Sequence, residues 1–176
     1  MKYRRMPIEE ESPEQLGYDK IRFNLTESSV RDRSLADLGI EVGDMLLFYG
    51  DHAGNDTFRE LIAAQSGAAG GVGRDDVLVT AGAAQALFII ATSLLDKGDH
   101  LVVVRPNYAT NIETPRAIEA DISYLDLTFE EGFRIDTDKL MALVTPRTRY
   151  VSITLPHNPT GVTMSEADLR LSLIHI

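Results

Sequence analysis

From residue 76 to residue 155 the sequence alternates between short apolar, β-branched runs and longer segments with helical spacing. The run "HLVVVR" is typical of a parallel strand covered on both faces. Because parallel strands need crossover connections, the alternation predicts an α/β sheet with helices between the strands. The expected strands are residues 76–80, 100–105, 122–127 and 150–155, and the expected helices are residues 57–65, 81–98, 112–119 and 137–144.

The segments before this sheet are less regular. Residues 1–45 are polar and weakly periodic, with Pro7, Pro13 and Gly17 as breakers, which predicts an amino-terminal arm with a short helix or two. Asn55 and Asp56 are placed to cap the helix that follows them. The glycine-rich "GAAGGVG" follows a helix and leads into a strand, which is the reverse of the order in a dinucleotide-binding fingerprint, so we interpret it as a connector.

Composition excludes several classes of function. A formal net charge of −10 without a basic cluster argues against nucleic-acid and anionic-membrane partners. The absence of cysteine excludes disulfides and a cysteine nucleophile, and it fits a reducing cytoplasm. The four histidines show no paired ligand spacing, so no metal site is expected. The most apolar stretch, residues 77–95, is interrupted by polar residues and reads as a strand and a buried helix, not a membrane span.

Three expected strands end in unusual residues, and ligands of open α/β sheets bind beyond the carboxyl ends of strands. After the first, "TAGAAQA" joins a strand to a helix N-terminus through small side chains at residues 80–84, which indicates either an anion site there or a tight turn that needs only glycine. After the second, Tyr108 is placed to stack on a flat ligand or to fill a core corner. After the fourth, Asn158 in "LPHNPTG" forms either an Asn-Pro turn or an amide donor to a phenolate oxygen.

These strand ends, in this order, resemble the class I/II aminotransferases, which are fold-type I pyridoxal-phosphate (PLP) enzymes. The resemblance runs from Tyr49 to Leu169 through "YGDHAGNDTFRELIA", "VLVTAGAAQALF", "GDHLVVVRPNY" and "LPHNPTG". It implies the three-layer α/β/α sandwich of the PLP-dependent transferase large domain, here in part, with an amino-terminal arm. The expected division is residues 1–45 as arm or small-domain segment and residues 46–170 as the first half of the large domain.

The resemblance also implies roles for individual residues. The Ala83 and Ala84 amides match the cup for the PLP phosphate, Tyr108 matches the ring that stacks on the pyridine, and Asn158 matches the donor to the phenolic oxygen. Tyr49 matches a tyrosine that reaches the phosphate of a neighbouring subunit, which implies a homodimer. The bonds before Pro106 and Pro159 match places where the family has cis proline.

The implied activity is movement of an amino group between an amino acid and a 2-oxo acid. The family's Schiff-base lysine follows the asparagine turn, whereas Lys2, Lys20, Lys97 and Lys139 all precede Asn158. We therefore assign no catalytic residue in this chain and expect it to be inactive as given. The alternatives are a PLP-dependent lyase or synthase of the same fold, a non-catalytic PLP-binding domain of a transcription regulator, or a short protein that binds PLP weakly.

Two further expectations concern the sheet and the last residues. In the family's sheet, the strand that matches residues 77–80 lies beside the last strand. Here residues 77–80 are therefore expected to lack a neighbouring strand, and residues 150–155 are expected to present an unpaired edge that favours aggregation. The final "LSLIHI" breaks the helical pattern and is similar to a translated transposon end used in sequencing libraries. We expect residues 171–176 to be an adapter-derived tail outside the fold, the alternative being a genuine apolar helix turn.

Overall fold

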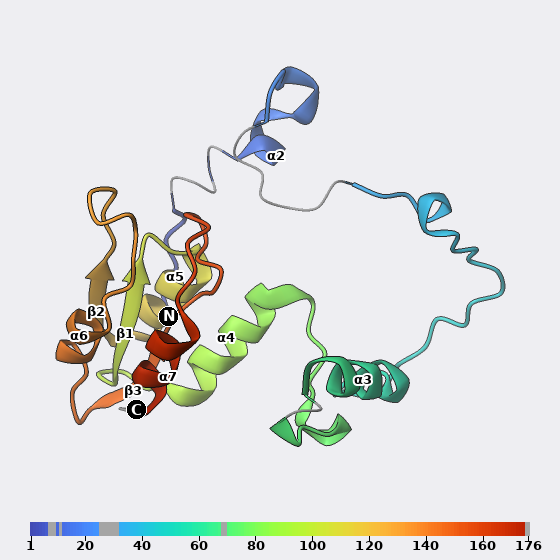
Figure 1. Ribbon diagram of the computed structural model, residues 1–176. Coiled ribbons are helices and arrows are strands. Elements are labelled where there is room, and N and C mark those ends of the chain that lie inside the picture. Colours follow the sequence, from blue (N-terminus) through green and yellow to red (C-terminus); the bar gives the residue numbers. More distant parts are fainter. Residues whose placement is uncertain (7–9, 11, 25–31, 68–69, 175–176) are drawn as a thin grey trace. The chain divides into compact units, whose positions relative to one another are not determined.

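The structure of the protein is a computed structural model that describes residues 1–6, 10, 12–24, 32–67 and 70–174. The chain forms two compact units, one of residues 7–80 and one of residues 1–6 together with residues 81–176. Figure 1 shows the helices and strands of both units, coloured along the sequence. The expected boundary between arm and large domain at residue 45 stays a prediction.

The unit of residues 7–80 contains only short helical elements in its described part. Asn55 caps helix α3, because its side-chain Oδ1 accepts the Phe58 N–H at 3.0 Å, as the sequence predicted. The described elements are α2 (Pro13–Leu16), the 3-10 turns Tyr18–Lys20, Ala36–Leu38 and Arg74–Asp76, α3 (Asp56–Ile62), and the π-helical turn Ala63–Gly67 that continues it.

A buried arginine holds the end of this unit to helix α3. Arg59 is 7% exposed, and its Nε donates to the Val77 carbonyl oxygen at 2.9 Å. The same guanidinium pairs with Asp56 at 3.3 Å and with Asp75 at 3.6 Å. Because a buried charge is stable only when it is paired, these contacts fix residues 75–77 against the helix.

The expected strand at residues 76–80 is wrong: residues 77–80 have no regular secondary structure. A strand is stabilised by a ladder of hydrogen bonds to a neighbour. Within the described part of this unit no segment forms a strand, and the Val79 N–H instead donates to the Ala53 carbonyl oxygen at 2.9 Å. The run is β-branched as expected, but none of the described strands pairs with it.

We predict that Gly54→Ala destabilises this unit. Gly54 has φ +109°, and a Cβ there would lie 2.5 Å from the Cβ of Val79. Strain and overpacking each cost roughly 1–3 kcal/mol, so exchange of the Val79 amide, measured by NMR, should accelerate at least about tenfold. Gly39→Ala is the matched control, because Gly39 has φ +64° and no atom within 4 Å of a built Cβ. If the Val79 amide exchanges faster by the same factor in both variants, the clash with the Val79 side chain is not the cause.

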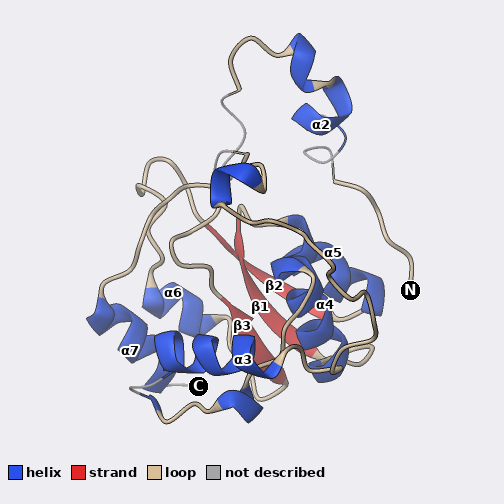
Figure 2. Cartoon of the chain, turned by 90° about the vertical axis from the view of Figure 1, so that its right-hand side faces the viewer, coloured by secondary structure: helices blue, strands red, loops and turns tan. Residues whose placement is uncertain are grey.

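The unit of residues 81–176 is built on a parallel sheet of three strands, β1 (His100–Arg105), β2 (Asp121–Asp126) and β3 (Thr148–Ser152). The order is β2-β1-β3, with Val103 of β1 opposite Tyr124 of β2 and Ser152 of β3. Figure 2 shows the strands between helices. The helices are α4 (Gly82–Leu94), α5 (Ala109–Ile118), α6 (Thr137–Ala142) and α7 (Glu166–Ile174), and the expected sheet with helical crossovers is thereby confirmed.

Side chains of the central strand β1 alternate between two apolar clusters. Leu101 and Val103 pack with residues of α4 and α5 on one face of the sheet. Val102 and Val104 pack with Leu140 of α6 on the other face. All four of these β1 side chains are 0% exposed, which confirms a strand covered on both faces and a three-layer arrangement. No helix in the described part of the chain is long and apolar enough to cross a membrane.

The outer edge of β3 has no strand beside it among the described residues, as expected from the resemblance. The bonds Arg105–Pro106 and Asn158–Pro159 are cis, which confirms both expected positions, and Leu155–Pro156 is cis as well. Helix α7 includes residues 171–174, while residues 175–176 lie outside the described residues. The origin of residues 171–176 stays a prediction.

Candidate functional site

Four of the five predicted site residues lie at the carboxyl edge of the sheet. Tyr108 follows β1, Asn158 follows β3, and both strands end at this edge because they are parallel. Helix α4 runs back toward the start of β1, so its first turn, with Ala83 and Ala84, lies at the same edge (Figure 1). The topology therefore gathers these residues from three separate segments of one unit.

The first turn of α4 is open to a ligand. In any α-helix the first amides have no acceptor within the helix, and here the N-cap residue, Ala81, makes no side-chain bond to them. Ala83 and Ala84 are exposed, while the Gln85 side chain accepts the Ala81 N–H at 2.5 Å. Gly82 has φ +80°, and nothing lies within 4 Å of a Cβ built on it. Uncovered amides at the positive end of a helix of 13 residues bind anions, above all phosphate.

Asn107 shapes the loop that presents Tyr108. Its Nδ2 donates to the Val104 carbonyl oxygen at 2.9 Å, and its Oδ1 accepts the Tyr108 N–H at 2.8 Å and the Asn111 Nδ2 at 2.9 Å. One amide thus joins the end of β1 to the first turn of α5. The Tyr108 side chain is 45% exposed, so it does not fill a core position. The ring is accessible for stacking on a ligand.

The turn with Asn158 is closed by its backbone. The His157 N–H donates to the Val162 carbonyl oxygen at 2.7 Å, and the Gly161 N–H donates to the His157 carbonyl oxygen at 2.6 Å. Gly161 has φ +74°, a conformation that favours glycine. Asn158 itself is exposed, and no hydrogen bond to its side chain is present within the described chain. Its amide can donate to a ligand without being titrated.

His157, the neighbour of Asn158, was not predicted to have a structural role in this turn. Its side chain is 2% exposed, and its Nδ1 lies 2.7 Å from the Thr160 Oγ1. Burial lowers the pKa of His157, and the Pro106 carbonyl partly offsets this by raising it. The signal available was the position of a histidine inside the "LPHNPTG" turn, but a pattern of residues cannot show which side chain faces inward.

Arg105 was also missed as a structural residue of this edge. Its guanidinium makes two bonds to Asp126, from Nε at 2.6 Å and from the second terminal nitrogen at 2.7 Å, and it lies 3.9 Å from the centre of the Tyr124 ring. Hydrogen bonding from Arg105 lowers the pKa of Asp126. Since this fork geometry satisfies the charge of Arg105, the residue joins β1 to β2 and is not an unpaired cation for a ligand.

Tyr49 lies in the other unit, and its side chain is fully exposed there. Its proposed relation to the phosphate site stays a prediction. It ends a run of large apolar side chains that are all more than half exposed, namely Met45, Leu46, Leu47, Phe48 and Tyr49. Such a run is typical of a surface that is covered by a partner.

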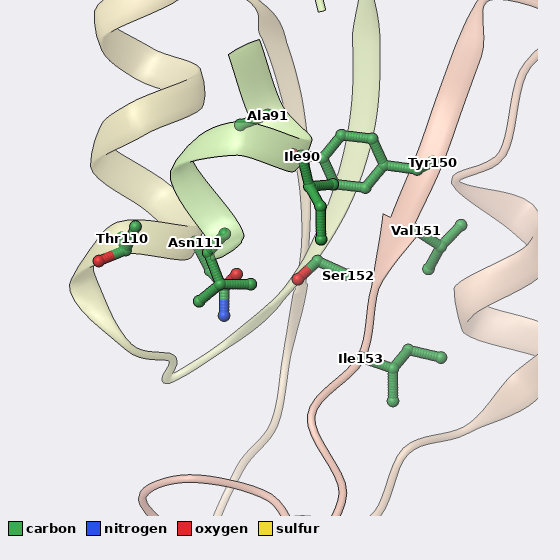
Figure 3. A pocket seen from close by; sticks show the side chains of 9 residues that line it. Ile90, Ala91, Thr110, Asn111, Tyr150, Val151, Ser152 and Ile153 are labelled. Atoms are coloured by element: carbon green, nitrogen blue, oxygen red, sulfur yellow. The ribbon is translucent and has the colours of Figure 1, made fainter. Parts of the chain in front are cut away.

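A cavity of about 200 Å³ lies along the open edge of β3, and Figure 3 shows the side chains that line it. Its wall is mostly apolar, and burial raises the pKa of Tyr150 in it. None of the five predicted site residues lines this cavity. The lining comes from α4, from the start of α5, from β3 and from the residue that follows β3, namely Leu87, Ile90, Ala91, Thr110, Asn111, Tyr150, Val151, Ser152 and Ile153.

The sheet unit contains two lysines beyond residue 80, and both form ion pairs with glutamate side chains. Lys97, in the turn before β1, pairs with Glu119 at 2.6 Å, and Lys139 of α6 pairs with Glu131 at 2.6 Å. The hydrogen bond that each lysine donates to its carboxylate raises the pKa of that lysine. Both are surface charges, as expected. Among the described residues no group of three or more His, Asp or Glu is placed to hold a metal ion.

Comparisons with known proteins match this chain to one family. The model described as "Aminotransferase class I and II" matches residues 24–172. The arginine–pyruvate transaminase AruH of Pseudomonas aeruginosa is 35% identical over 121 residues, which cover 68% of this chain and 31% of that protein. The chain spans about a third of the length of this relative.

Solved structures give the same result. The structure of aspartate aminotransferase from Thermus thermophilus with maleate matches with a TM-score of 0.67 and 30% identity, over 73% of this chain and 35% of that one. The structure of the PLP-dependent cyclase OrfR matches with a TM-score of 0.65 and 35% identity, over 81% of this chain and 36% of that one.

Proposed function

The chain belongs to the class I and II aminotransferase family, and we propose that the whole protein is a PLP-dependent aminotransferase that moves an amino group between an amino acid and a 2-oxo acid. The observation that supports this most directly is that the carboxyl edge of the sheet carries an exposed tyrosine and an exposed asparagine, with the first turn of α4, whose N-cap residue makes no side-chain bond, at the same edge. Helix amides can bind a phosphate, a tyrosine can stack on an aromatic ring, and an asparagine amide can donate to a phenolic oxygen.

PLP fits the residues that are present. The Ala83 and Ala84 amides would hold its phosphate, Tyr108 would stack on its ring, and the Asn158 amide would donate to its phenolic oxygen. When bound, PLP supplies an electron sink for reactions at the α-carbon of an amino acid. The contribution of these residues is binding and orientation, since none of them is placed to move a proton.

We propose a homodimer for the whole protein. The exposed apolar run at residues 45–49 supports it, because a surface of this kind is stabilised when a second chain covers it. Tyr49 at the end of this run is proposed to reach the phosphate site of the partner.

The reaction type has a second candidate. AruH is an arginine–pyruvate transaminase, whereas OrfR is a PLP-dependent cyclase, and the two are equally similar to this chain at 35% identity. The residues at this edge bind the cofactor and not the substrate, so a lyase, synthase or cyclase would use the same arrangement. The amino donor and the acceptor therefore depend on residues outside this site.

The cofactor site is tested by titrating the chain with PLP and with pyridoxal, which lacks the phosphate, and following the cofactor's absorbance and fluorescence. Ala83→Pro removes one amide in the first turn of α4, where proline is tolerated, and the residue before it is Gly82, the first residue of the helix, with positive φ. A hydrogen bond to a charged group is worth about 1.5–3 kcal/mol, so PLP affinity should fall roughly 10- to 100-fold while pyridoxal binding is unchanged.

Asn158→Ala should weaken binding of both compounds, because both contain the phenolic oxygen. Thr163→Ala is the matched control, since Thr163 is exposed in the same loop region. If the unmodified chain binds PLP no better than pyridoxal, the phosphate site is wrong. If it binds neither, these residues do not form a cofactor site in this chain.

A further inference from the structure

We propose that Asn107 is a positioning residue for Tyr108: its side chain fixes the backbone at the start of α5, so that the Tyr108 ring is left free to face a flat ligand. The inference rests on the proposed function, because it takes Tyr108 as the ring that stacks on the cofactor. Its structural part, the set of bonds that Asn107 makes, does not require that PLP is the ligand.

Tyr108 is the N-cap residue of α5, and its side chain does not perform the function of a cap. Short side chains with an oxygen are preferred at this position, because they can accept one of the amides that the first turn leaves without a partner. Tyr108 makes no such side-chain bond. Since its ring is also exposed, neither capping of the helix nor packing in the core accounts for a tyrosine here, whereas contact with a ligand does.

The side chain that bonds this turn belongs to the preceding residue. The Asn107 Oδ1 accepts the Tyr108 N–H at 2.8 Å and the Asn111 Nδ2–H at 2.9 Å, so it joins the N-cap backbone to the first turn of α5. The Tyr108 carbonyl oxygen accepts the Asn111 N–H at 3.0 Å. Both polar groups of the Tyr108 backbone are therefore bonded within the turn, and neither bond uses the tyrosine side chain.

The other half of the Asn107 amide holds the turn to the sheet. Its Nδ2 donates to the carbonyl oxygen of Val104 at 2.9 Å, and Val104 is a fully buried residue of the central strand β1. Asparagine combines a donor and an acceptor in one short side chain, which these contacts require, whereas an ionised aspartate only accepts. The backbone of Tyr108 is thereby fixed relative to β1.

Asp136 provides a matched control in the same unit. It is the N-cap residue of α6, and its Oδ1 accepts the Asp138 N–H at 2.9 Å and the Lys139 N–H at 3.0 Å. Asp136→Ala therefore removes bonds of the same kind from another helix terminus. If the loss of such bonds acted on the site only by loosening the unit, Asp136→Ala would weaken ligand binding as much as Asn107→Ala.

Amide hydrogen exchange, measured by NMR on the full chain and corrected for intrinsic rates, tests the bonds of Asn107. In Asn107→Ala the Tyr108 amide should exchange at least roughly fivefold faster, while the β1 amide of Val103 keeps its rate. Asn107→Asp keeps an acceptor for the Tyr108 N–H, so the acceleration should be smaller there. Asp136→Ala should leave the Tyr108 rate unchanged. An unchanged Tyr108 rate in Asn107→Ala would overturn the proposal, as would equal acceleration of Tyr108 and Val103.

A double-mutant cycle with PLP tests the positioning role. Tyr108→Ser removes the ring but supplies an N-cap oxygen, so the turn should keep its fold while the dissociation constant for PLP rises roughly tenfold. Asn107→Ala alone should raise this constant roughly three- to tenfold, because its effect cannot exceed that of the ring. In the Tyr108→Ser background the same change should add less than about twofold, since no ring remains to be positioned. Asp136→Ala should leave the constant unchanged.

A merely structural role would give a different pattern. If the effects of Asn107→Ala and Tyr108→Ser multiply in the double variant, Asn107 does not act through the ring and the positioning role is wrong. Asn107→Asp, which loses only the bond to Val104, replaces Asn107→Ala in the cycle if the alanine variant does not fold. If the unmodified chain binds no PLP, the proposed function fails and the role of Asn107 toward a ligand fails with it. The exchange rates then still show whether Asn107 fixes the Tyr108 backbone, so the two failures are distinguishable.

Discussion

Borohydride reduction of this chain in the presence of PLP is expected to leave no lysine labelled at a one-to-one ratio. A covalent bond to PLP requires an uncharged amine close to the bound cofactor. Lys97 and Lys139 are paired with carboxylates that raise their pKa, which keeps both amines protonated. Lys2 and Lys20 are exposed residues, and none of the four follows the Asn158 turn.

Mass spectrometry of the reduced and digested chain measures the label at each lysine. Random surface reaction should give low labelling that rises in proportion to PLP concentration, whereas a specific site would saturate. Asn158→Ala is the control, because it weakens the proposed cofactor site without touching any lysine. Saturating label on one lysine that disappears in Asn158→Ala would contradict this prediction and would identify that lysine as a candidate for the catalytic role.

The parts of the fold that depend on local sequence were predictable. "HLVVVR" is apolar at every inner position, and β1 is indeed covered on both faces. Asn55 caps α3 because the cap and the amide that it accepts are three residues apart. By contrast, the β-branched run at residues 77–80 satisfied every local criterion and formed no strand, since pairing depends on a segment far away in the sequence.

The same distinction, between features set by local sequence and features set by distant contacts, applies to the candidate site. The location of Ala83, Tyr108 and Asn158 was predictable because each follows an apolar run, and parallel strands end at one edge, whereas their role toward a cofactor stays a proposal. The burial of His157 and the bonds between Arg105 and Asp126 were not, because both depend on how packing orients the side chains. A local motif indicates which residues are candidates to contact a ligand. The residues that support them can be identified only from the packing of the folded chain.

Leu140→Ala is the substitution expected to cost the most stability. Leu140 is 0% exposed and is the buried residue of α6, a helix of only six residues. It packs against Val102 and Val104 of β1 and against Leu125 of β2. A helix this short is not stable alone, so its docking depends on this side chain. Truncating a buried leucine costs about 2–5 kcal/mol, and urea unfolding followed by circular dichroism should show a loss in that range.

Met141→Ala is the control on the same helix, because Met141 is only partly buried and should cost less than about 1.5 kcal/mol. Leu101→Ala tests the opposite face, where Leu101 is also 0% exposed and packs against α4 and α5. If both helix layers stabilise the sheet, the two leucine variants should lose similar amounts of stability. A large loss for Leu101→Ala with a loss below about 1 kcal/mol for Leu140→Ala would mean that α6 does not cover its face in solution, since a leucine that is already solvated has little burial to lose.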